Sequence, residues 1–310
     1  MKKLFLIFSL LFSLFLFTSC SDNEAYDVVT TNFVCYDAVR ASTSKTDIKV
    51  KMIIKPGAEI HDYELSMADT RAILGAKMFV YVGGESDVWA DKVVADAKAK
   101  GVKIISMFEI LEDSLLLEEG EEDEYDEHVW IDPTNYERIV KVIGQELSYL
   151  FPDVKDYINT MSEAYRIDLT NLDLDIKNLV SKSTKKMIVV ADRNPFLYFG
   201  THYGIKVYGA LSGCSTDGTA SSEKIIELKN VVEQNKINTI FTIELSNGSI
   251  ANTLSNEIDK DIRNNSYDGE KVSIRTLFSM HNISKNDFEA GITYVTMLRK
   301  NLEVLNTALS

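Results

Sequence analysis

Histidines are the residues of this chain with the clearest capacity for metal chemistry. His61 follows the apolar run Asp47–Ile54. His281 follows the apolar run Val272–Phe278, and His128 lies where an acidic stretch gives way to an apolar one. Open parallel sheets bind ligands beyond the ends of their strands, where these histidines fall. Neutral imidazole binds zinc, and also manganese when carboxylates complete the ligand set. The three positions therefore suggest a divalent metal site, although their spacing alone favours ordinary surface or core histidines.

Motifs of the common hydrolases are missing from the sequence. It contains no His-Glu-x-x-His or Cys-x-x-Cys motif, no Ser-His-Asp elbow and no phosphate-binding glycine loop. A zinc hydrolase needs an open metal position beside a general base, whereas capture needs only a closed or nearly closed ligand set. We therefore expect a carrier and not an enzyme. The fourth histidine, His202, lies between Gly200 and Gly204 and is expected in an exposed turn.

Two similar halves must position these residues, and both alternate strand-like runs with helical patterns. In the first half the helical patterns include Ser66–Leu74 and Trp89–Lys100. Apolar strands separated by helices predict parallel sheets covered on both faces, so the expected fold class is α/β. The eight strand-like runs are Val28–Phe33, Asp47–Ile54, Met78–Val82, Val102–Met107, Met187–Ala191, Lys206–Ala210, Thr239–Ile243 and Val272–Phe278.

One long helix is predicted between the halves. Apolar residues recur every three or four positions from Ile158 to Leu179, which places them on one face of a helix. Asp153 is expected to cap its start. The predicted organisation is an N-terminal α/β lobe over residues 27–152, a rigid linking helix over 153–182 and a C-terminal α/β lobe over 183–310.

The N-terminus has the form of a bacterial lipoprotein signal. Two lysines precede an apolar run over residues 4–17, which is short for a membrane span, and small residues then lead to Cys20. Removal of residues 1–19 would leave the Cys20 thiol to carry a lipid, with residues 20–26 as a tether. The mature chain is thus expected to be exported and anchored to the outer face of the cytoplasmic membrane. The alternative is an ordinary secretory signal with a chance cysteine.

The chain is acidic and holds few cysteines. Its formal net charge of −14 becomes −16 once the two signal lysines are removed, which argues against nucleic acid as a partner. Residues 118–127 include eight acids in ten and are expected to form a solvated loop, or a low-affinity collector of cations beside His128. Cys35 and Cys214 are far apart in the sequence and are expected to be buried structural thiols.

The sequences around two histidines carry a specific resemblance. They read PGAEIHDYELSMAD at residues 56–69 and DEHVWIDPTN at residues 126–135, and the chain ends in a helical pattern over Tyr294–Leu309 with Asn301 near its end. These segments resemble the metal-binding solute-binding lipoproteins of the zinc/manganese ABC importers, in matching order along the whole mature chain. The resemblance implies two α/β lobes joined by a rigid helix, one metal in the cleft, and delivery to a membrane permease by a monomer.

The resemblance also implies a ligand set. His61 and His128 match the first two ligands of the family. Arg193 falls on the third position, where the family has His or Glu, and a guanidinium cannot bind a cation.

The fourth ligand of the family is usually an Asp, and its position falls at His281. We therefore predict His61, His128 and His281 as ligands, with Asp192, Glu244 or water as the fourth. Arg193 would then support the site by pairing with Asp192 or Glu244.

Three histidines favour zinc over manganese, because manganese prefers more oxygen ligands. Manganese stays the alternative metal. A surface adhesin, which a lipid anchor would also suit, and a zinc-dependent hydrolase stay the alternative functions.

Overall fold

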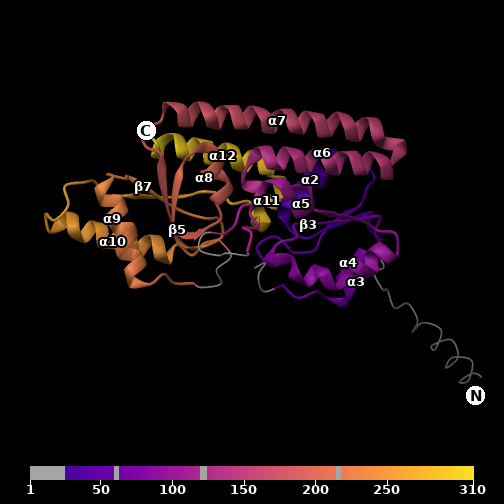
Figure 1. Ribbon diagram of the computed structural model, residues 1–310, viewed down its shortest axis with the longest axis horizontal. Helices are drawn as coiled ribbons and strands as arrows, with labels where there is room; N and C mark the ends of the chain where they lie inside the picture. Colours follow the sequence, from indigo (N-terminus) through magenta and orange to yellow (C-terminus); the bar gives the residue numbers. More distant parts are fainter. Residues whose placement is uncertain (1–24, 59–62, 119–123, 214–217) are drawn as a thin grey trace, which may run out of the picture.

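The computed structural model describes residues 25–58, 63–118, 124–213 and 218–310. Within these ranges the strands form two parallel sheets of four strands each, in the orders β2-β1-β3-β4 and β6-β5-β7-β8 (Figure 1). Each strand overlaps one of the eight predicted runs, so the α/β class is confirmed. The strands are β1 (Val28–Thr30), β2 (Val50–Met52), β3 (Met78–Tyr81), β4 (Lys103–Ser106), β5 (Met187–Asn194), β6 (Lys206–Ser212), β7 (Thr239–Thr242) and β8 (Ser273–Thr276).

Helices cover both faces of each sheet. We call the part from β1 to α6 the first lobe and the part from β5 to β8 the second lobe. The first lobe contains α2 (Phe33–Thr43), α3 (Met67–Gly75), α4 (Asp91–Ala99), α5 (Met107–Ile110) and α6 (Pro133–Leu150), with the 3-10 turns η1 (Glu85–Ala90), η2 (Glu112–Ser114) and η3 (Val129–Ile131). The second lobe contains α8 (Leu197–Tyr203), α9 (Ser222–Gln234) and α10 (Ser249–Arg263). The turn η4 (Pro152–Val154) and α7 (Lys155–Lys182) connect the lobes, and α11 (Lys285–Glu289) and α12 (Tyr294–Ala308) follow β8.

The alternation of side chains explains why the central strands β1 and β5 carry consecutive apolar residues. In β1, Val28 packs into the core formed with α2, α6 and α7, whereas Val29 packs beneath α3 and α4. In β5, Ile188 belongs to the same central core and Val189 to the cluster beneath α9 and α10. Both faces of each sheet are therefore buried at these central strands, as is usual in parallel sheets.

The predicted linking helix is present as α7, with 28 residues and a length of about 42 Å. It runs along α6 and α12 and so lies over both lobes (Figure 1). The expected cap is wrong. Val154 occupies the cap position and no side chain caps the helix, because Asp153 lies inside the preceding turn η4.

The first predicted strand is shorter than its apolar run. Asn32 accepts a hydrogen bond on its side-chain oxygen from the backbone N–H of Cys35, at 3.2 Å. This side-chain cap begins α2 at Phe33, so the last residue of the predicted run belongs to a helix and not to the strand.

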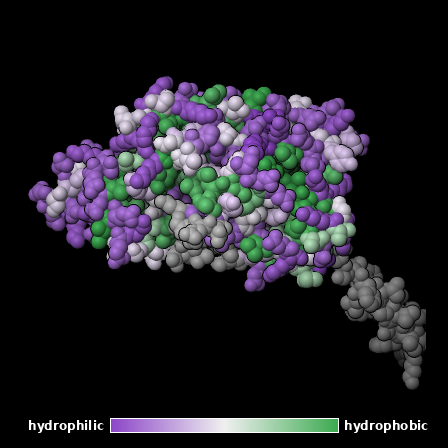
Figure 2. Space-filling model, viewed as in Figure 1, coloured by the Kyte–Doolittle hydropathy of each residue, from purple (hydrophilic) through white to green (hydrophobic). Residues whose placement is uncertain are grey.

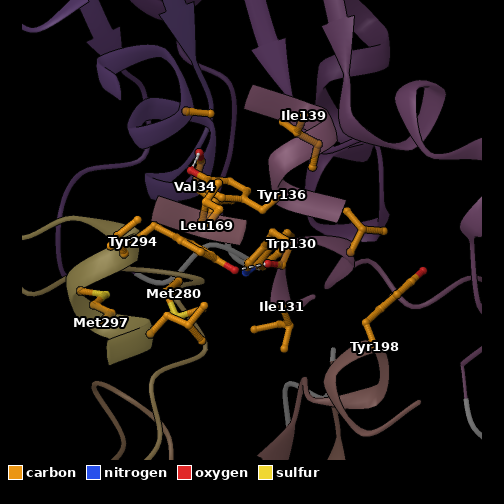
Figure 3. Packing of buried hydrophobic residues seen from close by; sticks show 14 of the residues in the cluster. Val34, Trp130, Ile131, Tyr136, Ile139, Leu169, Tyr198, Met280, Tyr294 and Met297 are labelled. Atoms are coloured by element: carbon orange, nitrogen blue, oxygen red, sulfur yellow. Dashed lines mark hydrogen bonds between the residues drawn. The ribbon is translucent and has the colours of Figure 1, made fainter. Parts of the chain in front are cut away.

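One apolar core extends through both lobes (Figure 3). The ring of Tyr294, at the start of α12, stacks on the ring of Tyr136 in α6 with centroids 3.9 Å apart. Its hydroxyl donates to the backbone oxygen of Trp130 at 2.6 Å. The guanidinium of Arg40 donates to the backbone oxygen of Ile292 at 2.9 Å. The segment after β8 therefore returns to the first lobe and binds it.

The surface is largely hydrophilic, and the one described cysteine is buried. Hydrophilic side chains cover most of the face in Figure 2, above all over α9 and α10. None of the helices in the described ranges is long and apolar enough to cross a membrane. Cys35 is buried and forms no disulfide, as predicted, and burial raises the pKa of its thiol. Cys20 and Cys214 lie outside the described residues.

Candidate metal centre

Three side chains from two distant segments of the sequence converge where the lobes meet. Glu127, His128 and His281 each offer one ligand atom, and these atoms all lie within 4.8 Å of one another. The Nε2 atom of His281 is 3.6 Å from Oε1 of Glu127. The two imidazole rings meet edge to face with centroids 5.0 Å apart. Two imidazole nitrogens and a carboxylate oxygen form a ligand set that zinc commonly takes in proteins.

His128 is held with one ring nitrogen turned to the cluster. Its side chain is fully buried, and Nδ1 lies 3.1 Å from Oδ1 of Asp126, which also accepts the backbone N–H of His128 at 2.8 Å. A carboxylate only accepts, so Nδ1 carries the proton and Nε2 presents its lone pair. Among the described residues Nε2 has no hydrogen-bond partner. A buried acceptor of this kind suits a metal ion.

The charge around His128 also sets its protonation. Burial acts to lower the pKa of the imidazole, but the nearby carboxylates of Asp126 and Glu127 attract the imidazolium. The net effect raises the pKa of His128 above its usual value.

His281 is presented by a turn that Glu244 holds in place. The buried Met280 before it has a left-handed φ of +57°. The Glu244 carboxylate accepts the backbone N–H and the hydroxyl of Ser279, both at 2.7 Å, and the backbone N–H of Asn282 at 3.4 Å. Burial raises the pKa of Glu244, and these donors act against that shift. Glu244 therefore lies beside the cluster with its oxygens already engaged.

Trp130 connects the turns that carry the two histidines. Its ring centroid lies 5.3 Å from that of His128 and 5.4 Å from that of His281. Its indole N–H donates to the backbone oxygen of Ser279 at 2.8 Å. The fully buried indole thus fixes the spacing between the two imidazoles.

Glu127 is the site residue that the sequence analysis did not single out. It ends the acidic run 118–127, yet its side chain is completely buried. Gly84 makes room for it, because a Cβ on Gly84 would lie 2.8 Å from Oε2 of Glu127. Gly213 does the same for His128, since its Cβ would lie 2.8 Å from the ring atom Cε1. In the sequence, Glu127 could have been recognised from its position directly before His128.

The contact with Gly84 gives a testable expectation. Gly84→Ala should displace the Glu127 carboxylate and lower zinc affinity by about tenfold, the scale of changes that misplace a ligand. Competition titration against a chromophoric chelator measures this. Gly75→Ala is the matched control, because a Cβ there meets no heavy atom within 4 Å. Equal affinities for the two variants would show that Glu127 is not a ligand.

The cluster opens into a pocket of about 170 Å³ between the lobes. Its walls include Gly57, Ala58, His128, Arg193, Pro195, Gly213, Ile243, Glu244, Leu245, Ser279, His281 and Asn282. The side chain of Asn282 accepts from the backbone N–H of Gly57 at 3.3 Å and donates to the backbone oxygen of Ala58. The chain leading to His61 is therefore bound beside His281, while His61 itself lies outside the described residues.

The remaining predicted residues lie near the site in different roles. Arg193 lines the pocket, and its backbone N–H donates to the Asp192 carboxylate at 2.9 Å. Asp192 also accepts from the Ser246 hydroxyl and is not part of the three-residue cluster. The flanking glycines predicted an exposed turn for His202, and this prediction is wrong. His202 belongs to α8 and contacts two carboxylates.

Known proteins are similar to this chain over most of its length. A family model described as "ZnuA: Zinc-uptake complex component A periplasmic" matches residues 28–308. The zinc-binding lipoprotein AdcA of Streptococcus pneumoniae strain R6 is 31% identical over 98% of this chain, which spans only 60% of that relative. The high-affinity zinc uptake system protein ZnuA of Bacillus subtilis is 26% identical, over 93% of this chain and 89% of its own length.

Solved structures share the fold over nearly the whole chain. The Zn(II)-bound ZnuA-like domain of S. pneumoniae AdcA has a TM-score of 0.74 and 29% identity, covering 92% of this chain and 99% of that domain. A mutant structure of the laminin-binding adhesin Lmb from Streptococcus agalactiae has a TM-score of 0.77 and 26% identity, covering 92% and 100%. With the family model matched from the first strand to the last helix, the chain belongs to the ZnuA family of zinc-uptake components.

Proposed function

We propose that this chain captures zinc outside the cytoplasmic membrane and delivers it to the permease of an ABC importer. The observation that carries the proposal is the buried convergence of Glu127, His128 and His281, with Nε2 of His128 presented to the cluster. Zinc is favoured over manganese because two imidazoles supply soft nitrogen ligands. Relatives in the family are named for zinc binding or zinc uptake, which supports the same metal.

The proposed ligands are Glu127, His128 and His281, with His61 as the further ligand inferred from the sequence. Glu244 is proposed as the support of the His281 turn and not as a ligand, since its oxygens accept three hydrogen bonds there. Asp192 likewise accepts from neighbouring groups. A pocket enclosed between two lobes would release its ion when the importer moves the lobes apart.

Attachment and partners follow from the same proposal. Cys20 would carry the lipid and hold the chain at the outer face of the membrane, as the lipoprotein name of AdcA supports. The chain would act as a monomer, with the permease as its protein partner. Adhesion is the secondary function, favoured by the name of the similar Lmb structure.

Metal analysis of the chain purified without chelator, followed by competition titration, tests the proposal. We expect one zinc per chain, tighter binding of zinc than of manganese, and no turnover of esters or peptides. A chain that binds laminin but no zinc would contradict capture and favour adhesion.

Zinc affinity should depend on pH through His128. Above the raised pKa of His128 the imidazole carries no proton to displace, so affinity should be constant there. Below that pKa a proton must leave Nε2, and affinity should fall by about tenfold per pH unit. Zinc titrations from pH 8 to pH 5 measure the onset, which is the pH at which the affinity begins to fall. Asp126→Asn removes the main attraction for the imidazolium, so its onset should shift to lower pH. An unshifted onset would contradict this role of Asp126.

A further inference from the structure

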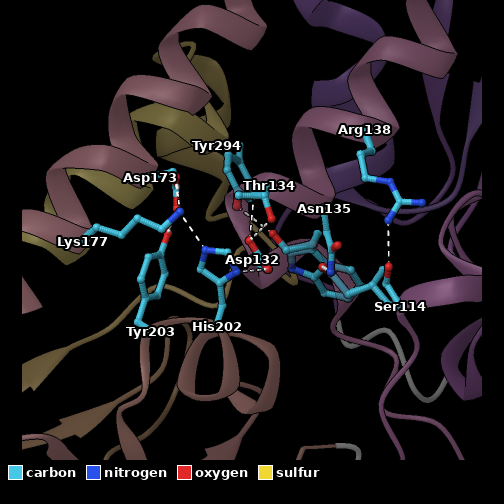
Figure 4. A network of polar contacts seen from close by, with 12 residues as sticks. Ser114, Asp132, Thr134, Asn135, Arg138, Asp173, Lys177, His202, Tyr203 and Tyr294 are labelled. Atoms are coloured by element: carbon cyan, nitrogen blue, oxygen red, sulfur yellow. Dashed lines mark hydrogen bonds and ion pairs between the residues drawn. The ribbon is translucent and has the colours of Figure 1, made fainter.

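His202 lies at the meeting point of three elements that the metal centre does not use (Figure 4). It belongs to α8 of the second lobe. Its Nδ1 atom is 2.9 Å from Oδ2 of Asp132, and its Nε2 atom is 3.1 Å from Oδ1 of Asp173. Asp132 is the N-terminal cap of α6 in the first lobe, and Asp173 lies on α7. One imidazole therefore joins both lobes and the connecting helix.

The chemistry of the contact requires a cation. Carboxylates only accept hydrogen bonds, so both ring nitrogens of His202 must donate, and the geometry is that of an imidazolium between two carboxylates. Other donors complete the network. Asp173 also accepts from the Tyr203 hydroxyl at 3.1 Å and from Nζ of Lys177 at 2.7 Å. The side chains of Asp132 and Asp173 are 9% and 10% exposed, so water screens these contacts only weakly.

Asp132 connects this contact to the metal centre through the short turn that separates it from His128. The turn η3 begins directly after His128 and ends directly before Asp132. The other oxygen of Asp132 accepts from the backbone N–H and the hydroxyl of Thr134, at 2.8 and 2.7 Å. The carboxylate is therefore fixed on one side by α6 and on the other by His202.

We propose that His202 is a positioning residue for metal capture, because it fastens the second lobe to the turn that carries His128. The inference rests on the proposed function. Without the imidazolium, the buried carboxylates of Asp132 and Asp173 lose the cation between them, and the second lobe loses an attachment to the ligand-bearing turn. The bound ion should then escape more often.

Zinc dissociation, followed by stopped-flow transfer to a chelator, tests the proposal in the full chain. His202→Gln should raise the dissociation rate constant about tenfold, as expected for loss of a charge-assisted contact. His202→Arg restores a cation with several donors and should return the rate to within about twofold of the wild-type value. Asp173→Asn should also speed release, because it removes one carboxylate of the pair.

Lys229→Gln is the matched control. Lys229 contacts Glu233 and Asp261 within the second lobe and is similarly exposed, at 18% against 23% for His202, but it does not touch Asp132. Its variant should release zinc at the wild-type rate. A wild-type rate in His202→Gln, or failure of His202→Arg to restore the rate in a chain with unchanged melting temperature, would overturn the positioning role. If the wild-type chain itself binds no zinc, the proposed function fails instead.

Discussion

Zinc affinity should fall by at least about 100-fold in His128→Ala, because the change removes a ligand and changes in the supporting shell alone cost 10- to 100-fold. His128 is expected to show the largest loss because its ring is fully buried and Asp126 fixes its orientation. Competition titration with a chromophoric zinc chelator measures the affinity.

A second substitution separates ligand loss from damage to the fold. His128→Gln keeps a polar side chain of similar size at the same buried position but supplies no imidazole nitrogen. It should lose affinity nearly as severely as alanine while the metal-free protein keeps a melting temperature close to that of the wild type. Wild-type affinity in both variants would remove His128 from the ligand set and with it the proposed site.

The second large effect is expected in the stability of the metal-free chain. Glu244→Ala leaves two backbone N–H groups and the Ser279 hydroxyl without their acceptor and should lower the free energy of unfolding by about 3 kcal/mol. The released turn also holds Met280 in its left-handed conformation, so zinc affinity should fall with stability. Urea denaturation without metal measures the first effect.

The control is Glu257→Ala, which removes a carboxylate that is 47% exposed and pairs loosely with Lys260 on α10. Its free energy of unfolding should stay within about 0.5 kcal/mol of the wild-type value. If Glu244→Ala instead keeps full stability and loses zinc, Glu244 binds the ion directly, as the alternative from the sequence allowed.

The sheets and the long helix could be predicted because their signals are local. Strands near the centre of each sheet give short runs of consecutive apolar residues, and the stripe from Ile158 to Leu179 repeats at the helical period. The end of β1 was misjudged because apolar character does not distinguish a strand from a buried helix. Only the cap from Asn32 marks the change at Phe33.

The site was harder to predict because its burial arises from contacts between distant segments. Glu127 has the same composition around it as the rest of the acidic run, and its burial depends on a close approach of Gly84, which lies more than 40 residues earlier in the chain. His202 was misplaced for the same reason. The glycines on either side favour a turn, whereas Asp132 and Asp173 reach it from elsewhere in the chain.

The central apolar core, which both lobes share, makes the two halves mutually dependent. Tyr294 of α12 stacks on Tyr136 of α6, and α7 packs against helices of both lobes, α2 and α6 in the first and α8 in the second. Division of the chain between the two lobes would therefore yield two fragments, each exposing apolar surface that the other covers in the intact protein.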